Sequence, residues 1–310
     1  MWATRAGGKV SDQPFFSIVI PSYERPDRLL SCLKALERLD YPRDRFEVIV
    51  VDDGSRESLQ HVVDGLRDRQ TVHLVRQAHA GPATARNTGA ARARGEFVAF
   101  TDDDCAPAAD WLQCLAGRFA SSPHAMLGGR TLNALPTQVY SSASQLLIDY
   151  LYACYNAEPD HARFFTSNNM AVPAEDFRQI GGFDVRFPLA AAEDRDLCER
   201  WFREGRPMIY VSEACVHHAH ALTLRGFWRQ HWNYGRGAYY FQQARARRGQ
   251  SRIRFEPISF YPRLLGYPMS RARGWRALRL VGLLGITQVA NAMGFFYEAV
   301  TQFLRKGAGE

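Results

Sequence analysis

The sequence predicts an α/β fold in which helices flank a mainly parallel central sheet, and three observations support this prediction. Short apolar runs alternate with helical segments at a spacing of roughly 25–30 residues, as in chains that build parallel sheets. Two of the apolar runs end in adjacent aspartates, and parallel sheets bind ligands at the carboxyl ends of their strands. The chain has 310 residues, 46% of them hydrophobic, and is long enough to bury a sizeable core.

Four expected strands, each followed by an expected helix, make up the amino-terminal part of this fold. The first strand (15–23) is apolar and β-branched. The helix after it (25–39) has leucines at helical spacing and Pro26 in its first turn. The remaining strands are expected at 46–55, 72–77 and 96–104, and the remaining helices at 58–68, 81–95 and 110–120.

The amino-terminal segment and the cysteines of the chain indicate a cytoplasmic protein. Residues 1–14 have the composition of a flexible leader and lack the apolar centre of a signal peptide. No two cysteines form a C-x-x-C pair, so we expect buried free thiols in a reducing compartment, without disulfides or a zinc site. The six cysteines are Cys32, Cys105, Cys114, Cys154, Cys198 and Cys215.

Composition and motifs disfavour several classes of protein. Charged residues are 23% and aromatic residues 12% of the chain, which argues against global disorder. There is no G-x-G-x-x-G after the first strand and no G-x-x-x-x-G-K-[ST] motif, so a dinucleotide-dependent dehydrogenase and a P-loop NTPase lose support. The net charge is +7, with an arginine-rich region between Arg225 and Arg279 that favours anionic partners.

Three adjacent aspartates, Asp102 to Asp104, follow the fourth apolar run in the segment AFTDDDCAP. Like charges at this spacing repel and require a counter-charge in a folded chain. Two carboxylates in an Asp-x-Asp pattern present oxygen ligands to Mg²⁺ or Mn²⁺, which proteins hold together with substrate phosphates. The pattern occurs by chance in many chains and has little weight alone.

The order of four motifs has more weight than any one of them. IVIPSYERPDRLLSCLKAL, VIVVDDGS, ARNTGAARARGEFVAFTDDD and AAEDRDLCERWFREG follow one another along residues 18–205. In this order the sequence resembles the inverting family 2 glycosyltransferases with the GT-A fold, roughly over residues 16–220. The resemblance implies a nucleotide-sugar-binding catalytic domain at 15–220 and leaves a helical, basic and aromatic region at 221–310.

The resemblance also implies roles for matching residues. The loop after the first strand borders the nucleotide, an acidic pair contacts base and ribose, and a third segment lies near the donor sugar. In this sequence they are Pro21, Ser22, Tyr23 and Glu24; Asp52 and Asp53; and Arg86 and Asn87. Asp102 and Asp104 match the metal-binding pair, with Asp103 contacting donor hydroxyls or supporting the loop.

Asp194, with Glu193 beside it, matches the catalytic base of the family. An inverting transfer needs a base for the acceptor hydroxyl, and a carboxylate becomes a better base when burial or a neighbouring acid raises its pKa. The segment 193–205 also reads as a helix, and acids are favoured in a first helical turn, so both roles can hold.

Other candidate residues have structural explanations that compete with a functional role, and for two asparagines the two explanations have equal weight. Loop hydrogen bonding competes with a sugar-binding role at two asparagines, and helix packing competes with donor or acceptor contacts in the later region. These residues are Asn168, Asn169, Tyr234 and Arg236. His217 or His218, with His220 nearby, is expected to complete a Mn²⁺ or Mg²⁺ site, while ordinary polar contacts remain the alternative.

The segment 280–297 has no charged residue and arginines on its amino-terminal side. It fits a buried helix, a helix lying in the membrane interface, or a short span. Interleaved arginines and aromatic residues before it also suit single-stranded RNA, but their helical character argues against that, and we expect no nucleic acid.

We therefore expect a metal-dependent inverting glycosyltransferase that uses a UDP, GDP or dTDP sugar and acts at the inner face of the cell membrane. Its acceptor would be a saccharide or a lipid-linked molecule of the cell envelope. A nucleotidyltransferase acting on sugar phosphates and a non-catalytic module that binds anionic surfaces remain alternatives. An aspartyl phosphatase would carry its Asp-x-Asp after the first strand.

Overall fold

The structure is a computed structural model that describes residues 13–65, 71–250 and 256–307. Most of the expected leader, and the end of the helix expected at 58–68, lie outside these residues.

Eight strands form one mixed sheet in the order β3-β2-β1-β4-β7-β6-β8-β5. The first four strands in this order are parallel, as expected, whereas β7 pairs antiparallel with both β4 and β6, and β5 pairs antiparallel with β8. The parallel character is therefore strongest in the amino-terminal half. The strands are β1 Phe16–Ser22, β2 Phe46–Asp52, β3 Val72–Arg76, β4 Phe97–Phe100, β5 Cys105–Pro107, β6 Met126–Asn133, β7 Met170–Pro173 and β8 Met208–His218.

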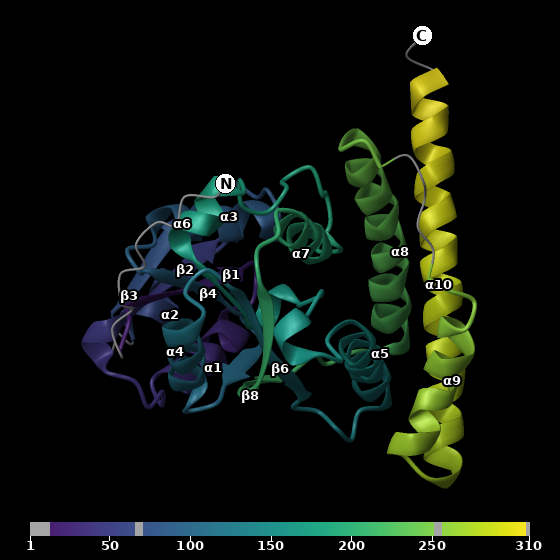
Figure 1. Cartoon of the computed structure of the whole chain (residues 1–310), viewed down its shortest axis with the longest axis horizontal. Helices are drawn as coiled ribbons and strands as arrows, with labels where there is room; N and C mark the ends of the chain where they lie inside the picture. Colours follow the sequence, from purple (N-terminus) through teal and green to yellow (C-terminus); the bar gives the residue numbers. More distant parts are fainter. Residues whose placement is uncertain (1–12, 66–70, 251–255, 308–310) are drawn as a thin grey trace.

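Helices cover both faces of the sheet, and each face has its own apolar core (Figure 1). One core contains α1, α2 and α4, with Trp111 fully buried, and the other contains α3, α6 and α7, with Trp201 fully buried. The helices are α1 Pro26–Leu36, α2 Gln60–Asp64, α3 Pro82–Arg92, α4 Trp111–Ser121, α5 Val139–Tyr155, α6 Ala174–Gln179 and α7 Glu193–Arg203. Short 3₁₀ turns occur at Arg43–Arg45, Pro159–His161 and Ser167–Asn169.

One expected element boundary changes at a place that bears on the site. β4 ends at Phe100, before the aspartates, because Thr101 to Asp104 turn into the short strand β5.

The cysteines are free, as expected, but Cys154 is exposed and only Cys32, Cys105 and Cys198 are fully buried. The expectation that all six are buried was wrong, because Cys154 lies on the outward face of α5.

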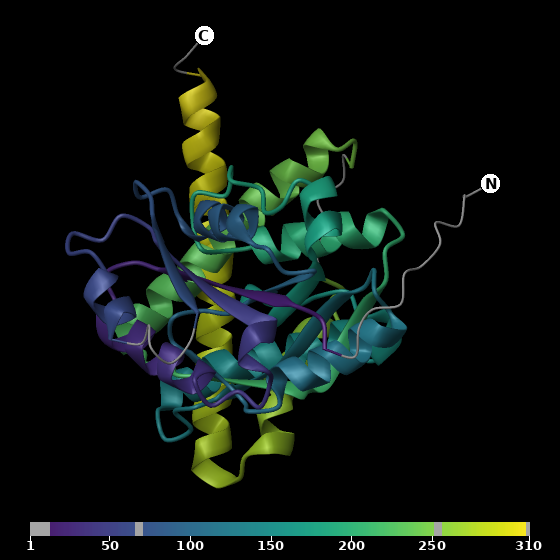
Figure 2. The same cartoon turned by 90° about the vertical axis from the view of Figure 1, so that its left-hand side faces the viewer.

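Three helices follow the sheet: α8 Leu224–Arg247, α9 Phe260–Arg271 and α10 Gly274–Gly307. α8 and α10 lie side by side, and the end of α10 extends past the sheet domain in both views (Figures 1 and 2). Among the described residues, the segment Gly274–Arg305 of α10 is long and apolar enough to cross a membrane, judged by length and composition only.

Two glycines set how closely α8 and α10 approach. A Cβ on Gly235 of α8 would lie 1.9 Å from the carbonyl oxygen of Asn291, and a Cβ on Gly294 of α10 would lie 2.1 Å from that of Trp232. An ion pair beside this crossing joins Arg236 Nε to Glu298 Oε2 at 2.7 Å, with Glu298 buried. The backbones of α8 and α10 are therefore in direct contact at Gly235 and Gly294.

Gly235→Ala is expected to lower the stability of the protein by about 1–3 kcal/mol, because the added methyl group forces the two helices apart. The matched control is Gly282→Ala in α10, where a Cβ meets nothing within 4 Å. That change should leave the melting temperature unchanged or raise it, since alanine is the better helix former by about 1 kcal/mol. Equal melting temperatures for the two variants in thermal unfolding would contradict the close crossing.

Candidate functional site

A cavity of about 1380 Å³ opens at the carboxyl ends of β1 and β4 and extends towards α5, α8 and α10. It brings together most of the candidate residues from the sequence, which come from segments far apart in the chain. The candidates that line it are Pro21, Ser22, Tyr23, Asp53, Arg86, Asp102, Asp103, Asp104, Asn168, Glu193, Asp194, His218, His220 and Tyr234.

The loop after β1 presents an aromatic surface at one edge of the cavity. Glu24 has a left-handed backbone (φ 57°), its amide donates to Ser55 Oγ, and its carboxylate accepts the amide of Arg56. These bonds hold the loop against the turn after β2. Tyr23, which is 42% exposed, stacks on His79 with 4.3 Å between ring centroids. The two rings offer a flat surface of the kind that a base can stack on.

Asp52 and Asp53 at the end of β2 are bound within the protein. Asp52 is fully buried; its Oδ1 accepts the amide of Ser55 at 2.9 Å, and Arg76 Nε lies 3.6 Å from its Oδ2. Asp53 accepts the amides of Ala80 and Gly81 at 3.0 and 2.9 Å. Asp53 thereby fixes the loop that places His79 beside Tyr23, while Asp52 does not line the cavity.

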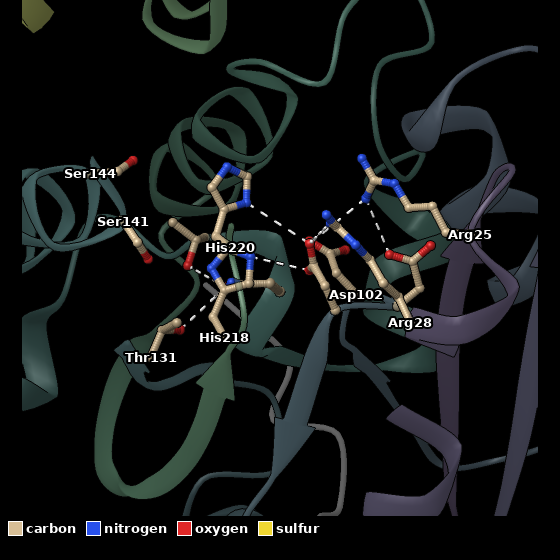
Figure 3. A network of polar contacts seen from close by, with 12 residues as sticks. Arg25, Arg28, Asp102, Thr131, Ser141, Ser144, His218 and His220 are labelled. Carbon is tan, nitrogen blue, oxygen red and sulfur yellow. Dashed lines mark hydrogen bonds and ion pairs between the residues drawn. The ribbon is translucent and has the colours of Figure 1, made fainter. Parts of the chain in front are cut away.

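Cationic side chains surround the three adjacent aspartates. Arg86 Nη2 lies 2.8 Å from Asp102, and Arg28 Nη1 lies 2.9 Å from Asp104. Arg25 is shared, because its Nη1 lies 3.3 Å from Asp103 and 3.8 Å from Asp104. His218 and His220 approach Asp104 from the side opposite Arg25 and Arg28 (Figure 3). These cations offset the repulsion expected from the sequence.

The neighbours of Asp103 and Asp104 move their pKa values in opposite directions. Burial, only partly offset by Arg25 and the Ser22 hydroxyl, raises the pKa of Asp103 to about 6. Burial would also raise the pKa of Asp104, but the hydrogen bond and charge of His218 outweigh it and lower that pKa to about 2. Asp104 in turn raises the pKa of His218 against the effect of burial. Of these two carboxylates, Asp104 is held more firmly in its charged form.

Asp104 and His218 fit a divalent metal ion. Asp104 Oδ1 and His218 Nε2 are 3.1 Å apart, and the partly exposed Asp102 carboxylate lies on the same loop. Cys105 is close to both, and burial raises the pKa of its thiol well above the ordinary value. Carboxylate and imidazole are suitable ligands for Mn²⁺, whereas thiolate ligands select softer metals.

The amino terminus of α7 carries Glu193 and Asp194, which line the same cavity as the aspartates. Ala192 before them has a left-handed backbone (φ 69°), which is strained for a residue with a Cβ. Arg86 Nη1 lies 3.0 Å from Glu193 Oε1, so one buried guanidinium joins Glu193 to Asp102. Burial and the charge of Asp194 raise the pKa of Glu193 to about 7, and burial raises the pKa of Asp194.

Several candidates lie outside the cavity, and for three of them, Asn87, Asn169 and Arg236, a structural role is evident. Asn87 bonds the amide and carbonyl of Phe183, and Asn169 accepts from the indole of buried Trp111. Arg236 pairs with Glu298, and exposed His217 precedes His218 on β8, where successive side chains point to opposite faces. The structure therefore does not bring these three or His217 to the site, nor Glu24 and Asp52.

Sequence reasoning missed Arg25, Arg28 and His79. Arg25 and Arg28 precede and begin α1, three positions apart, and look like ordinary surface charges until the fold places them beside Asp103 and Asp104. His79 lies in a loop with no motif of its own. The available signal was the three-residue spacing of the arginines at the carboxyl end of a strand.

Comparison with known proteins places the chain among sugar transferases. A family model described as "Glycosyl transferase family 2" matches residues 17–181. Glycosyltransferase AglE of Haloferax volcanii is 32% identical over 124 residues, covering 38% of this chain and 40% of that protein. Validoxylamine A glucosyltransferase of Streptomyces hygroscopicus subsp. jinggangensis is 29% identical over 235 residues, covering 67% of this chain and 56% of that protein. The chain spans about half the length of these curated relatives.

Solved structures share the fold. The mannosyltransferase PcManGT from Pyrobaculum calidifontis, solved with GDP-Man and Mn²⁺, superposes with a TM-score of 0.58 at 19% identity, over 96% of this chain and 80% of that chain. S. aureus TarS 1–349 in complex with UDP-GlcNAc gives a TM-score of 0.53 at 17% identity, over 94% and 92%. This likeness confirms the expected GT-A architecture.

Glu193→Gln is expected to remove part of the pH dependence of stability. The folded protein keeps the Glu193 proton up to about pH 7, whereas the unfolded chain releases it near the ordinary glutamate pKa of 4.5. The wild type therefore loses stability as pH rises through this window, and the glutamine variant lacks this loss. Its melting temperature, relative to wild type, should rise from pH 5 to pH 8 in EDTA. Exposed Glu57→Gln is the control, and a flat difference for Glu193→Gln would contradict the pKa shift.

Proposed function

Because the chain belongs to glycosyl transferase family 2, we propose that it transfers a sugar from a nucleotide-diphosphate donor to an acceptor hydroxyl with inversion at the anomeric carbon. One observation carries this proposal: the Arg86 guanidinium joins Asp102 to Glu193 in the lining of a single cavity, with Asp194 next to Glu193. A carboxylate that would bind the metal and a carboxylate that would act as the base thus line one cavity, which is large enough for a substrate.

The donor would lie between the Tyr23 ring and the aspartates. The stacked Tyr23 and His79 rings would take the base, and Asp53 would position the loop that carries His79. Asp102, Asp104 and His218 would hold Mn²⁺ or Mg²⁺. A bound divalent ion neutralises charge on a departing diphosphate. The neighbours solved with GDP-Man and with UDP-GlcNAc support a nucleotide-sugar donor, of the UDP, GDP or dTDP type.

Asp194 would act as the base. The acceptor oxygen attacks the anomeric carbon, the bond from that carbon to the diphosphate oxygen breaks, and the acceptor proton passes to Asp194. Burial raises the pKa of Asp194, which makes it a stronger base than an exposed aspartate. Arg86, anchored on Asp102, holds the neighbouring Glu193 and so fixes the first turn of α7.

The acceptor would be a saccharide or a lipid-linked molecule of the cell envelope, met at the cytoplasmic face of the membrane. The apolar α10 and the exposed arginines near its start support this place of action. Release of a nucleoside diphosphate distinguishes this activity from that of a nucleotidyltransferase, which releases pyrophosphate.

Asp194→Asn is expected to reduce sugar transfer by about 10²- to 10⁴-fold, because the amide cannot accept the hydroxyl proton. The test is a screen of UDP, GDP and dTDP sugars with Mn²⁺, in which release of nucleoside diphosphate is measured. Binding of the nucleotide and Mn²⁺ by calorimetry should stay at the wild-type level. Wild-type transfer rates in this variant would refute the assignment of the base.

His218→Gln is expected to weaken Mn²⁺ binding in the presence of UDP or GDP by at least about tenfold, since it removes an imidazole beside Asp104. His217→Gln is the matched control, because the same change is made one residue away on the exposed face of β8. Equal affinities for the two variants in calorimetry would rule out His218 as a ligand.

A further inference from the structure

The cavity continues past the catalytic acids into a region with apolar walls. Its lining there comes from three helices that lie outside the sheet: Leu147, Ile148 and Leu151 of α5, Phe260 of α9, and Phe295 and Phe296 of α10. These helices have no part in binding the donor in the function proposed above. The cavity is therefore rich in charge at the aspartates, whereas these three helices line it with apolar side chains and a few neutral polar ones, such as Gln145, Gln288 and Asn291, and with no charged residue.

The volume leaves room for more than a donor. Pockets of about 300–1,000 Å³ enclose most small-molecule ligands, whereas this cavity measures about 1380 Å³. A nucleotide sugar between Tyr23 and Asp194 would occupy the polar end and leave the apolar end for part of the acceptor.

Arg195 marks the boundary between the two ends. It follows Asp194 directly, its Nη2 lies 3.0 Å from Glu256 Oε1, and its guanidinium lies 5.0 Å from the centre of the Phe241 ring. All four residues line the cavity. An acceptor that places its hydroxyl at Asp194 can thus extend past Arg195 along Phe241 towards α10.

The wall formed by α10 is also part of an exposed apolar surface. Val289 and Phe296 line the cavity and are 54% and 63% exposed, so the cavity reaches the molecular surface between them. A row of exposed apolar side chains at helical spacing continues from there in both directions along α10. Its members, here called the α10 outer row, are Trp275, Leu278, Val289, Met293, Phe296, Val300 and Phe303.

We propose that the apolar end of the cavity binds the hydrocarbon chain of a lipid-linked acceptor, which enters between Val289 and Phe296 from a membrane against which the α10 outer row lies. This inference rests on the proposed function and specifies its acceptor. It assigns to α5, α9 and α10 a binding role that is separate from donor binding.

Charge on α10 favours an anionic bilayer over a second protein as the source of the chain. The only carboxylate in the α10 sequence, Glu298, is buried and paired with Arg236, so the outer row carries no acid. Arg271, Arg273 and Arg279 are exposed at the start of the row. Exposed arginine beside tryptophan suits a phospholipid headgroup region.

The packing of α8 favours a helix that lies on the membrane over one that crosses it. α8 runs beside α10 and its sequence contains five arginines, Arg225, Arg229, Arg236, Arg245 and Arg247. A crossing α10 would carry these charges into the hydrocarbon core, where each costs about 2.5 kcal/mol or more.

The test uses the full chain and n-alkyl β-glucosides of increasing chain length, kept below their critical micelle concentrations and without vesicles. Affinity for the wild type should rise with each methylene, by up to about fourfold. A dodecyl glucoside with a diazirine at the chain end should label α5, α9 or α10 next to the cavity when irradiated. Affinity that is independent of chain length would overturn the proposal.

Two double variants separate the cavity from the rest of the outer row. Val289→Ser with Phe296→Ser should abolish the dependence on chain length and the labelling. Val300→Ser with Phe303→Ser removes the same residue types, also exposed and on the same row but away from the cavity lining, and should leave both unchanged. Equal losses in the two double variants would contradict a subsite in the cavity.

Binding of UDP and GDP with Mn²⁺ is measured in parallel on every variant. A wild-type protein that does not bind UDP or GDP with Mn²⁺ would refute the proposed function. A wild-type protein that binds nucleotide but shows no dependence of glucoside affinity on chain length would refute only the acceptor subsite.

Discussion

The site depends on one buried cation, the guanidinium of Arg86. It lies in α3, yet it contacts Asp102 after β4 and Glu193 at the start of α7, which follow it in the chain by 16 and 107 residues. A buried arginine without its partners, or buried carboxylates without the arginine, costs about 3–5 kcal/mol. This penalty ties the position of α7 to the end of the parallel sheet. The same ion pair anchors Glu193 between the strained backbone of Ala192 and Asp194, which lines the cavity.

Much of the site followed from the sequence because strand ends in a parallel sheet meet at one edge. Asp102, Asp103 and Asp104 lie at that edge because they directly follow a buried apolar strand. The same pattern, an apolar run followed by aspartates, made them candidates in the sequence. Asp194 was placed by the resemblance, and the structure adds the raised pKa and the link through Arg86. The sheet itself was predictable as far as its parallel half; the antiparallel strand β7 depends on long-range pairing that no local pattern encodes.

Sequence spacing alone could not show which candidate residues lie outside the cavity, because some of them are adjacent in the chain to residues that line it. His217 and His218 differ by one position on a strand, and only the register of β8 decides which of them faces Asp104. Asn168 and Asn169 likewise differ by one position, and Asn169 lies in the core bonded to Trp111. Arg25 and Arg28 went unnoticed because an arginine at a helix start is usually a surface residue, and its partners follow some 75 residues later in the chain.

The crossing of α8 and α10 at Gly235 and Gly294 limits how this chain can change in length. Each residue inserted into a helix turns everything beyond it by about 100°. An insertion between Val289 and Gly294 would rotate Val289 and its neighbours out of the cavity wall, whereas an insertion beyond Gln302, the last α10 residue described as bonding to α8, would alter only the projecting end. We expect homologous chains to vary in the length of α10 after Gln302 and to keep a constant count of residues between Val289 and that point. The glycine pair thus fixes the register of α10 against α8, so the helix can change in length only at its carboxyl-terminal end.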